Sequence, residues 1–325
     1  MAEASAPLRI LVAGAGLFGR EHLDRLIKRD DVRIAGIADP NPAACDLARA
    51  RYRVADLFTD PLEMIARVPA DGVIVATPSS THVEIALRAI GHGRAVLLEK
   101  PVAPSADLAL RIAETAESAG VMVLPGHVLR HDRNHQRLVE IVKSGGVGSP
   151  LYVNARRYRD DSHVARYSDI DPVLMTLIHD IDLALWVAGA PFRAARAWRN
   201  PAVGFRSMTA TTCITTTGVI CDLRTAWTFA AGDLPADRLE VVGDRGSVEL
   251  EVGRTLHHYA EGNCRGLDLV APDDALANEL DHFLGCLRDP QRKPALTLRD
   301  AAAGLNLAGG LLRSLESGGT QEVMA

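Results

Sequence analysis

The chain has 325 residues, 47% of them apolar, which is enough for two ordinary hydrophobic cores. Its formal net charge is −5 with acids and bases interspersed, so no basic stripe indicates a nucleic acid or an anionic membrane as a partner. The apolar runs are far shorter than the ~20 residues of a membrane span. The N-terminal MAEASAPLR lacks a signal-peptide pattern, so we expect a cytoplasmic protein that binds a small molecule. The five cysteines form no CxxC pair, which favours reduced thiols over a disulfide framework or a zinc site.

Strand-like and helix-like segments alternate in the first half of the chain. Apolar runs rich in β-branched residues occupy 8–13, 32–38, 72–76, 95–99 and 121–125. Amphipathic stretches lie between them, at 16–29, 41–52, 81–90 and 105–119. This rhythm predicts βαβ units, and therefore an α/β domain with a doubly wound parallel sheet over residues 1–126.

A glycine-rich turn joins the first strand to the first helix. In this setting Gly14 permits the tight turn, Gly16 lets the backbone approach a pyrophosphate, and Gly19 allows the helix to pack closely on the strand. Leu17 and Phe18 stand at the helix N-terminus, where free N–H groups face the phosphates. The pattern predicts a dinucleotide site formed by these five residues.

Asp39 ends the second strand, about 20 residues after the last glycine of the turn. A carboxylate at this place hydrogen-bonds the ribose hydroxyls and repels a 2′-phosphate. We therefore expect NAD as the cofactor in preference to NADP. The alternative for Asp39 is a turn and a helix cap before Asn41 and Pro42.

Two further loops follow the fourth and fifth strands, with the sequences ATPSSTH (76–82) and EKP (99–101). Together with the glycine turn, they resemble the Gfo/Idh/MocA family of NAD(P)-dependent sugar and polyol oxidoreductases, and the likeness runs over almost the whole chain. The resemblance implies that the lysine of the EKP motif, Lys100, lies beside the nicotinamide and the substrate hydroxyl as a catalytic residue. The further cofactor contacts that it implies are Thr77, Pro78, His82 and Glu99.

Physical reasoning supports a role for Lys100. It stands at the carboxyl end of a parallel strand, where open α/β sheets place their ligand crevice. Desolvation and a positive nicotinamide ring would both lower the pKa of its ammonium group, and a protonated Lys100 would still polarise the substrate oxygen. The alternative is a surface lysine paired with Glu99. For His82, capping of the following helix is an alternative to cofactor contact.

From Leu151 onward the pattern changes to period-two alternation with close turns. Strands are predicted at 151–159, 193–198, 207–218, 219–229, 237–244 and 246–252, with late helices at 275–289 and 298–316. We therefore expect an α+β substrate-binding domain over residues 127–325, with a large, predominantly antiparallel open sheet. The resemblance implies that the open sheet face forms a homodimer or homotetramer.

Arginines and histidines near this junction are candidate ligand-binding groups. Arg156 or its neighbour Arg157 would meet a substrate carboxylate or phosphate, but alternation allows at most one of them to face the crevice. Three histidines spaced by four, at 127, 131 and 135, lack the acid or cysteine that would complete a metal site, so we expect no metal.

The stretch DPVLMTLIHDIDLALW (171–186) predicts a helix that begins with Asp171 as its cap and carries His179 two turns in. Resembling proteins commonly have a D-x-x-x-H pair here, in which the histidine is the acid/base for the substrate hydroxyl. His179 matches the catalytic histidine, whereas Met175 occupies the place of the aspartate, and both Met175 and Asp182 are expected near the substrate. Asp182, at i+3, would orient His179 from the other side. The alternative is a core histidine bonded to Asp182.

These residues predict an NAD-dependent dehydrogenase that oxidises a secondary alcohol of a sugar, cyclitol or sugar derivative. One alternative is a relative that recycles NAD around an elimination or hydrolysis. Another, suggested by Met175, is a non-catalytic sensor that responds to NAD or sugar.

Overall fold

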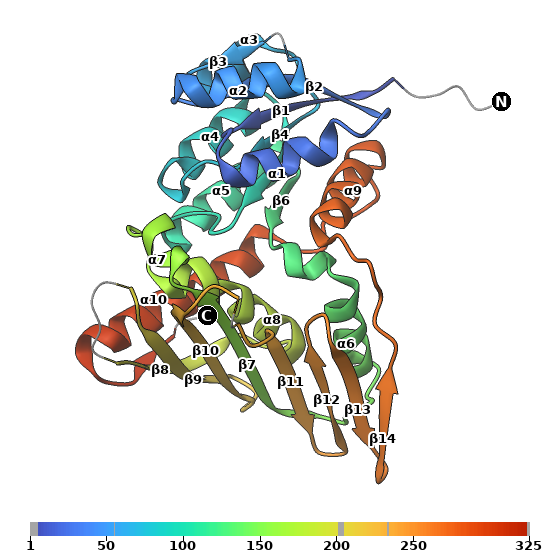
Figure 1. Ribbon diagram of the computed structural model, residues 1–325, viewed down its shortest axis with the longest axis vertical. Helices are drawn as coiled ribbons and strands as arrows, with labels where there is room; N and C mark the ends of the chain where they lie inside the picture. Colours follow the sequence, from blue (N-terminus) through green and yellow to red (C-terminus); the bar gives the residue numbers. More distant parts are fainter. Residues whose placement is uncertain (1–5, 55, 201–204, 233, 324–325) are drawn as a thin grey trace, which may run out of the picture. The chain divides into compact units, whose positions relative to one another are not determined.

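The computed structural model describes residues 6–54, 56–200, 205–232 and 234–323, so the first five residues of MAEASAPLR lie outside it. Its contacts divide the chain into two compact units (Figure 1). Unit 1 comprises Met1–Val128 and Leu276–Ala302, and unit 2 comprises Leu129–Ala275 and Ala303–Ala325. Every helix in the described part of the chain is too short or too polar to cross a membrane.

Unit 1 is a six-stranded, fully parallel sheet in the order β3-β2-β1-β4-β5-β6. This arrangement confirms the doubly wound α/β fold. Its strands are β1 (Leu8–Ala13), β2 (Val32–Ala38), β3 (Leu57–Phe58), β4 (Gly72–Val75), β5 (Ala95–Glu99) and β6 (Val123–Gly126). Its helices are α1 (Leu17–Leu26), α2 (Pro42–Tyr52), α3 (Pro61–Arg67), α4 (Ser79–Gly91), α5 (Ala106–Ala119) and α9 (Ala275–Arg288).

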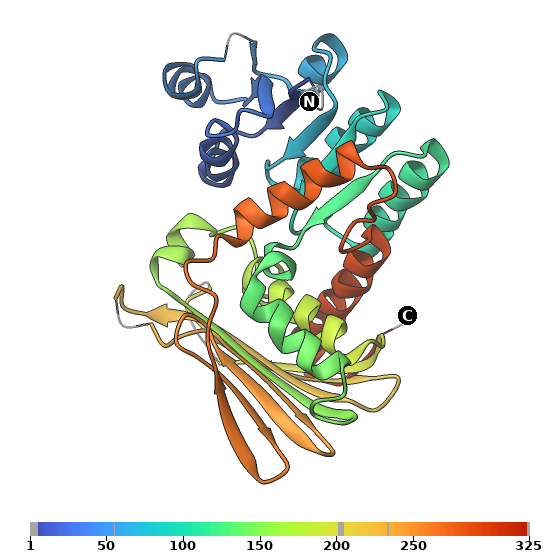
Figure 2. The same ribbon diagram turned by 90° about the vertical axis from the view of Figure 1, so that its right-hand side faces the viewer.

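The helix starts of unit 1 follow from their capping residues. Asn41 and Asp60 each accept a hydrogen bond from a first-turn N–H and are followed by proline, and Ser105 caps α5 in the same way. The core on one sheet face joins α1, α2 and α9 to the strands, whereas α4 and α5 contact each other on the opposite face (Figure 2). The sheet is therefore buried on both sides, as its continuous apolar strands require.

Helix α9 is the point at which the predicted domain division differs from the structure. The sequence assigned all of 127–325 to the second domain, but Leu276–Ala302 pack with unit 1. Leu280, Phe283 and Leu284 of α9 are fully or almost fully buried in the core of unit 1. Chain order alone gives no signal for a segment that returns to an earlier domain.

Unit 2 contains a nine-stranded sheet in the order β14-β13-β12-β11-β7-β10-β9-β8-β15, in which β7 and β10 are the parallel pair (Figure 1). The predicted α+β class with a predominantly antiparallel sheet is therefore confirmed. The strands are β7 (Pro150–Asp160), β8 (Phe192–Arg199), β9 (Met208–Thr215), β10 (Ile220–Phe229), β11 (Arg238–Gly243), β12 (Gly246–Glu251), β13 (Thr255–Ala260), β14 (Asn263–Leu267) and β15 (Gln321–Glu322).

Helices of unit 2 cover one face of this sheet (Figure 2). They include α6 (Arg133–Lys143), which contacts β12, α8 (Ile178–Ala188), which contacts β7 and β10, and the C-terminal part of α10 (Leu298–Ser317). A short helix, α7 (Ser162–Arg166), contacts the ends of β7 and β10. The opposite face carries no helix within the described ranges of unit 2. Trp198, Met208 and Ile220 are exposed while a neighbouring residue on each of their strands is buried, so strand alternation places them on this face. Helix α6 and strands β13 and β14 were not predicted from the sequence.

Candidate active site

The glycine turn at the end of β1 has the close packing that a dinucleotide cradle needs. Gly14 has a φ of +98°, and a Cβ there would lie 2.5 Å from the carbonyl oxygen of Ala76. A Cβ on Gly19 would lie 2.0 Å from the carbonyl oxygen of Gly14. Gly16 has no atom within 4 Å of its Cβ position, so the space above it is open to a ligand. The residues present therefore fit a pyrophosphate.

Helix α1 begins directly after this turn, at Leu17, without a side-chain cap on its first N–H groups. Leu17 and Phe18 are exposed on the surface of the turn. Uncapped N–H groups at a helix N-terminus bind anions, and the helix dipole adds to the attraction. The backbone of α1 can thus hold the phosphates of a dinucleotide.

Asp39 is held in place at the end of β2. One carboxylate oxygen accepts a hydrogen bond from the Ala15 N–H at 2.7 Å, and the other accepts from the Asn41 N–H at 2.9 Å. Each carboxylate oxygen has a second lone pair, so Asp39 can still accept hydrogen bonds from ribose hydroxyls. Asp39 thus stabilises the turn before α2, whose cap is Asn41, and this turn role is compatible with a cofactor role.

His82 links the loops after β4 and β5. Its Nδ1 lies 2.9 Å from the Pro101 carbonyl oxygen and its Nε2 lies 2.8 Å from the Thr77 carbonyl oxygen. Burial lowers the pKa of His82, so the imidazole is neutral and donates one of these bonds at a time. His82 therefore positions the loops that carry Thr77 and Lys100, and its direct contact with a cofactor remains a prediction.

Lys100 follows β5 and is anchored through its neighbour. The Glu99 side chain accepts a hydrogen bond from the Lys100 backbone N–H at 3.2 Å, and its other oxygen lies 2.7 Å from Nε2 of His22 on α1. His22 is not among the site residues predicted from the sequence. Its signal was a histidine on the apolar stripe of α1, where Gly19, Leu23 and Leu26 are also buried.

In unit 2, His179 lies on α8 just after a π-helical turn at Val173–Leu177. Asp171 caps this segment through the Val173 N–H, as predicted. Met175 is part of this π turn, four positions before His179, and its place near the substrate remains a prediction. His179 and Met175 are both partly exposed on the segment.

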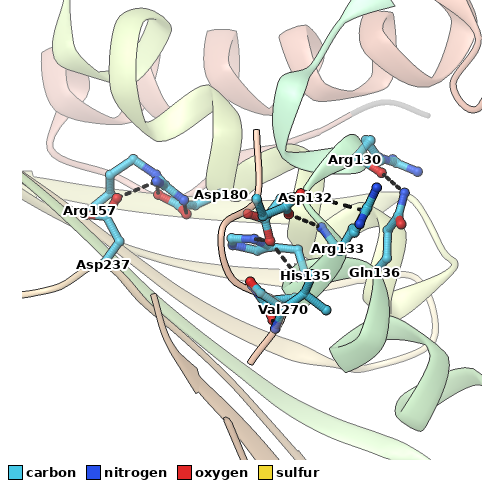
Figure 3. A network of polar contacts seen from close by, with 11 residues as sticks. Arg130, Asp132, Arg133, His135, Gln136, Arg157, Asp180, Asp237 and Val270 are labelled. Atoms are coloured by element: carbon cyan, nitrogen blue, oxygen red, sulfur yellow. Dashed lines mark hydrogen bonds and ion pairs between the residues drawn. The ribbon is translucent and has the colours of Figure 1, made fainter. Parts of the chain in front are cut away.

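Two aspartates that follow His179 on α8, Asp180 and Asp182, each form a buried ion pair with an arginine. Arg157 of β7 binds both carboxylate oxygens of Asp180, and it also binds Asp237 (Figure 3). Burial alone would lower the pKa of Arg157, but the carboxylates of Asp180 and Asp237 outweigh this effect and raise it. The guanidinium is therefore permanently charged, and it fixes the helix that presents His179.

Asp182 has a partner that the sequence did not suggest. Both of its carboxylate oxygens accept hydrogen bonds from Arg130, at 2.8 and 2.9 Å, and the same guanidinium lies 4.7 Å from the ring centre of Trp186. This pairing accounts for the burial of Asp182. Its orientation of His179 remains a prediction.

Arg156 lies on the other face of the sheet from His179. Arg157 faces α8, and successive strand residues point to opposite faces, so Arg156 points to the helix-free face. It stands in register with Arg224 of β10 and Arg238 of β11. This geometry argues against Arg156 and His179 contacting the same substrate within one chain.

The histidines spaced by four do not share a helix face. His131 ends a short 3-10 helix (Val128–His131), whereas His135 lies on α6 and contacts Asp132 at 2.7 Å (Figure 3). Among the described residues, three potential metal ligands come together elsewhere, at His22, Glu99 and Glu279.

Comparison with known proteins matches both units to one family. The model described as "Oxidoreductase family, NAD-binding Rossmann fold" matches residues 8–127, and the model "GFO/IDH/MocA C-terminal domain" matches residues 135–249. The chain is 31% identical over 192 residues to inositol 2-dehydrogenase of Burkholderia ambifaria, a match that covers 58% of this chain and 57% of the relative. It is 29% identical to inositol 2-dehydrogenase 2 of Saccharopolyspora erythraea, with 97% and 95% covered.

A solved structure is similar over almost the whole chain. UDP-N-acetylglucosamine 3-dehydrogenase from Acidithiobacillus ferrooxidans has a TM-score of 0.84 and 27% sequence identity, with 95% of this chain and 98% of that chain covered.

Proposed function

Since the chain belongs to the Gfo/Idh/MocA oxidoreductase family, with an NAD-binding Rossmann fold, we propose that it is a dehydrogenase that uses NAD to oxidise a secondary alcohol. The substrate class is a sugar, a cyclitol or a sugar derivative. The observation that carries the proposal is the open glycine cradle with Asp39 held beside it by the Ala15 N–H.

Asp39 supports the preference for NAD over NADP. Its carboxylate would bind ribose hydroxyls and repel a 2′-phosphate, and the residues that follow it, Pro40-Asn41-Pro42, include no arginine to bind one. Titration calorimetry with both dinucleotides tests this preference. Equal affinity for NADP would contradict it.

Lys100 and His179 supply the proposed proton chemistry. NAD held by the glycine turn and Asp39 would supply the acceptor for the hydride of the carbinol carbon. His179 takes the hydroxyl proton as general base, while Lys100 polarises the same oxygen. The anchored carboxylate of Glu99 and the paired aspartates around His179 support these roles, because both hold the reacting groups on rigid elements.

The names of the similar proteins supply the first substrates to test. Two relatives are named inositol dehydrogenases and one similar structure is a dehydrogenase of UDP-N-acetylglucosamine. The purified protein should therefore be mixed with NAD and a panel of inositols, nucleotide sugars and sugar acids while the reduced-nicotinamide absorbance is followed. We expect the reduced-nicotinamide absorbance to rise with at least one polyol of the panel. Silence throughout the panel, with NAD bound, would contradict net oxidation and favour cofactor recycling or sensing.

We further propose that the helix-free face of the unit 2 sheet binds another copy of this chain, as a homodimer or homotetramer. Trp198 is 49% exposed, Ile220 42% and Met208 37%, and they lie on three adjacent strands of that face. Large apolar side chains exposed on one face of a sheet support an interface between copies.

A further inference from the structure

Helix α9 places a carboxyl group in the core of unit 1. Glu279 lies on the apolar stripe that also contains Leu276, Leu280 and Phe283, and its exposed fraction is 0%. Neither of its carboxylate oxygens has a hydrogen-bond partner among the described residues. An ionised carboxylate in this position would carry a large desolvation penalty.

Glu279 lies next to the pair that anchors Lys100. One nitrogen of His22 and one oxygen each of Glu99 and Glu279 lie within 4.8 Å of one another. A gap of this size is closed by rotation of a glutamate side chain or bridged by one water. Gly126 leaves room for the Glu99 side chain, since a Cβ at that position would lie only 3.1 Å from the Glu99 Cδ.

Two buried carboxylates at this distance do not both ionise. Burial raises the pKa of Glu279 well above its usual range, and the negative charge of Glu99 raises it further. The other titratable groups near the pair are His22 from α1 and His82 from α4, whose pKa Glu99 also influences. Both oxygens of Glu99 already have a nitrogen partner, in His22 and in the Lys100 backbone, whereas neither oxygen of Glu279 has one among the described residues, so the proton belongs on Glu279.

A metal ion fits this cluster less well than a proton. Atoms that share a zinc ion at about 2.1 Å lie roughly 3.3 Å or more from one another. Nε2 of His22 and Oε1 of Glu99 are 2.7 Å apart, which is the distance of a direct hydrogen bond. The two residues are thus bound to each other.

We propose that Glu279 is a positioning residue for Lys100. Its carboxylic acid stays protonated and donates a hydrogen bond, directly or through one water, to Glu99. One oxygen of Glu99 also contacts His22, and the other accepts a hydrogen bond from the Lys100 backbone N–H. The role of Lys100 rests on the proposed function, whereas the protonation of Glu279 does not.

Infrared spectroscopy of the full-length protein tests the protonation without any turnover. At neutral pH, where surface carboxyl groups are ionised, wild type should show a carboxylic acid carbonyl band above the amide I band. Glu279→Gln should remove this band. Glu117→Gln, at an exposed glutamate paired with Arg299, is the matched control and should retain it. A wild-type spectrum without the band would overturn the proposal.

Wild-type protein alone settles the assignment if Glu279→Gln does not fold. Labelling with carboxyl-¹³C glutamate should shift the carbonyl band to lower frequency. A band whose frequency does not change on labelling would overturn the proposal. Metal analysis of the purified protein provides a second outcome. If wild type held one equivalent of a divalent ion and Glu279→Gln held none, the cluster would be a metal site and the proposal would be overturned.

Kinetics test the effect on Lys100. Glu279→Leu, which cannot donate a hydrogen bond, should lower kcat by tenfold or more with an unchanged Kd for NAD. Glu279→Gln, whose amide can donate to Glu99, should recover most of that loss. Equal losses in both variants, or a loss confined to NAD binding, would show a purely structural role.

Discussion

The carboxylate of Asp39 accepts a hydrogen bond from the Ala15 N–H, so the end of β2 is tied to the glycine turn after β1. This contact orients the carboxylate before any cofactor binds. A preoriented group loses less conformational entropy on binding, which is why we expect Asp39 to contribute strongly to cofactor affinity.

Asp39→Ala should weaken NAD binding by about tenfold to a hundredfold, since hydrogen bonds to a charged group contribute about 1.5–3 kcal/mol. The affinity of the variant for NADP should fall less than its affinity for NAD, because the substitution also removes the repulsion of the 2′-phosphate. Titration calorimetry measures both. Asp60→Ala is a matched control, because Asp60 likewise accepts a hydrogen bond from the backbone N–H two residues later. An equal loss of affinity for NAD and NADP would show that the Asp39 carboxylate does not contact the ribose hydroxyls.

Asp180→Ala should destabilise unit 2 by up to about 3–5 kcal/mol, because the buried Arg157 guanidinium loses its bidentate partner and keeps only Asp237. Urea unfolding followed by circular dichroism gives this free energy. The exposed Asp169 of the same unit, replaced by alanine, should leave stability nearly unchanged. Equal stability of the two variants would mean that the ion pair does not anchor α8.

Met175→Asp tests whether the π turn separates this position from His179. A carboxylate next to the imidazole would raise the pKa of His179 and move the acidic limb of the kcat/KM profile to higher pH. We expect this movement, because residue 175 precedes His179 by four positions, which is about one helical turn. Met175→Asn controls for the change of shape. An acidic limb that does not move in the aspartate variant would show that the π turn keeps residue 175 away from the imidazole.

His82 should make the stability of unit 1 depend on pH. Burial lowers the pKa of His82 in the folded state, so the unfolded chain takes up the proton more readily. Stability is therefore complete above the ordinary histidine pKa and is lost as the pH falls through the lowered value. Thermal unfolding at several pH values should show this loss in wild type and a smaller loss in His82→Gln. His92→Gln, at an exposed histidine, should behave as wild type.

Charged substitutions on the helix-free sheet face should separate the proposed copies. Trp198→Asp combined with Ile220→Asp places two like charges in an apolar interface, so sedimentation should show a smaller species. Leu47→Asp, at a residue of α2 that is 50% exposed, is the control. An unchanged mass for the sheet variant would locate any oligomer interface elsewhere.

Local patterns account for most of what the sequence predicted correctly. The spacing of Gly14, Gly16 and Gly19 reflects contacts within a few residues, and strand periodicity directly reports which side is buried. The cap at Asp171 and the alternation that separates Arg156 from Arg157 were readable for the same reason.

Features that depend on distant partners were not predicted. Asp182 pairs with Arg130, which lies 52 positions earlier, and Glu279 meets Glu99 through the return of α9 to unit 1. A glutamate on the apolar stripe of α9 was the available signal, because a charged residue rarely lies there without a reason. The π turn before His179 has no sequence pattern that distinguishes it from an α turn.

The most direct test of the central claim is a single-turnover measurement of hydride transfer to NAD, made with wild type, Lys100→Ala and His179→Ala and the polyol selected by the substrate screen. The account predicts a reduced-nicotinamide signal in wild type and a loss of at least a hundredfold in rate in each variant, with NAD affinity retained. Wild-type rates in both variants would contradict the assignment of these residues to the chemistry.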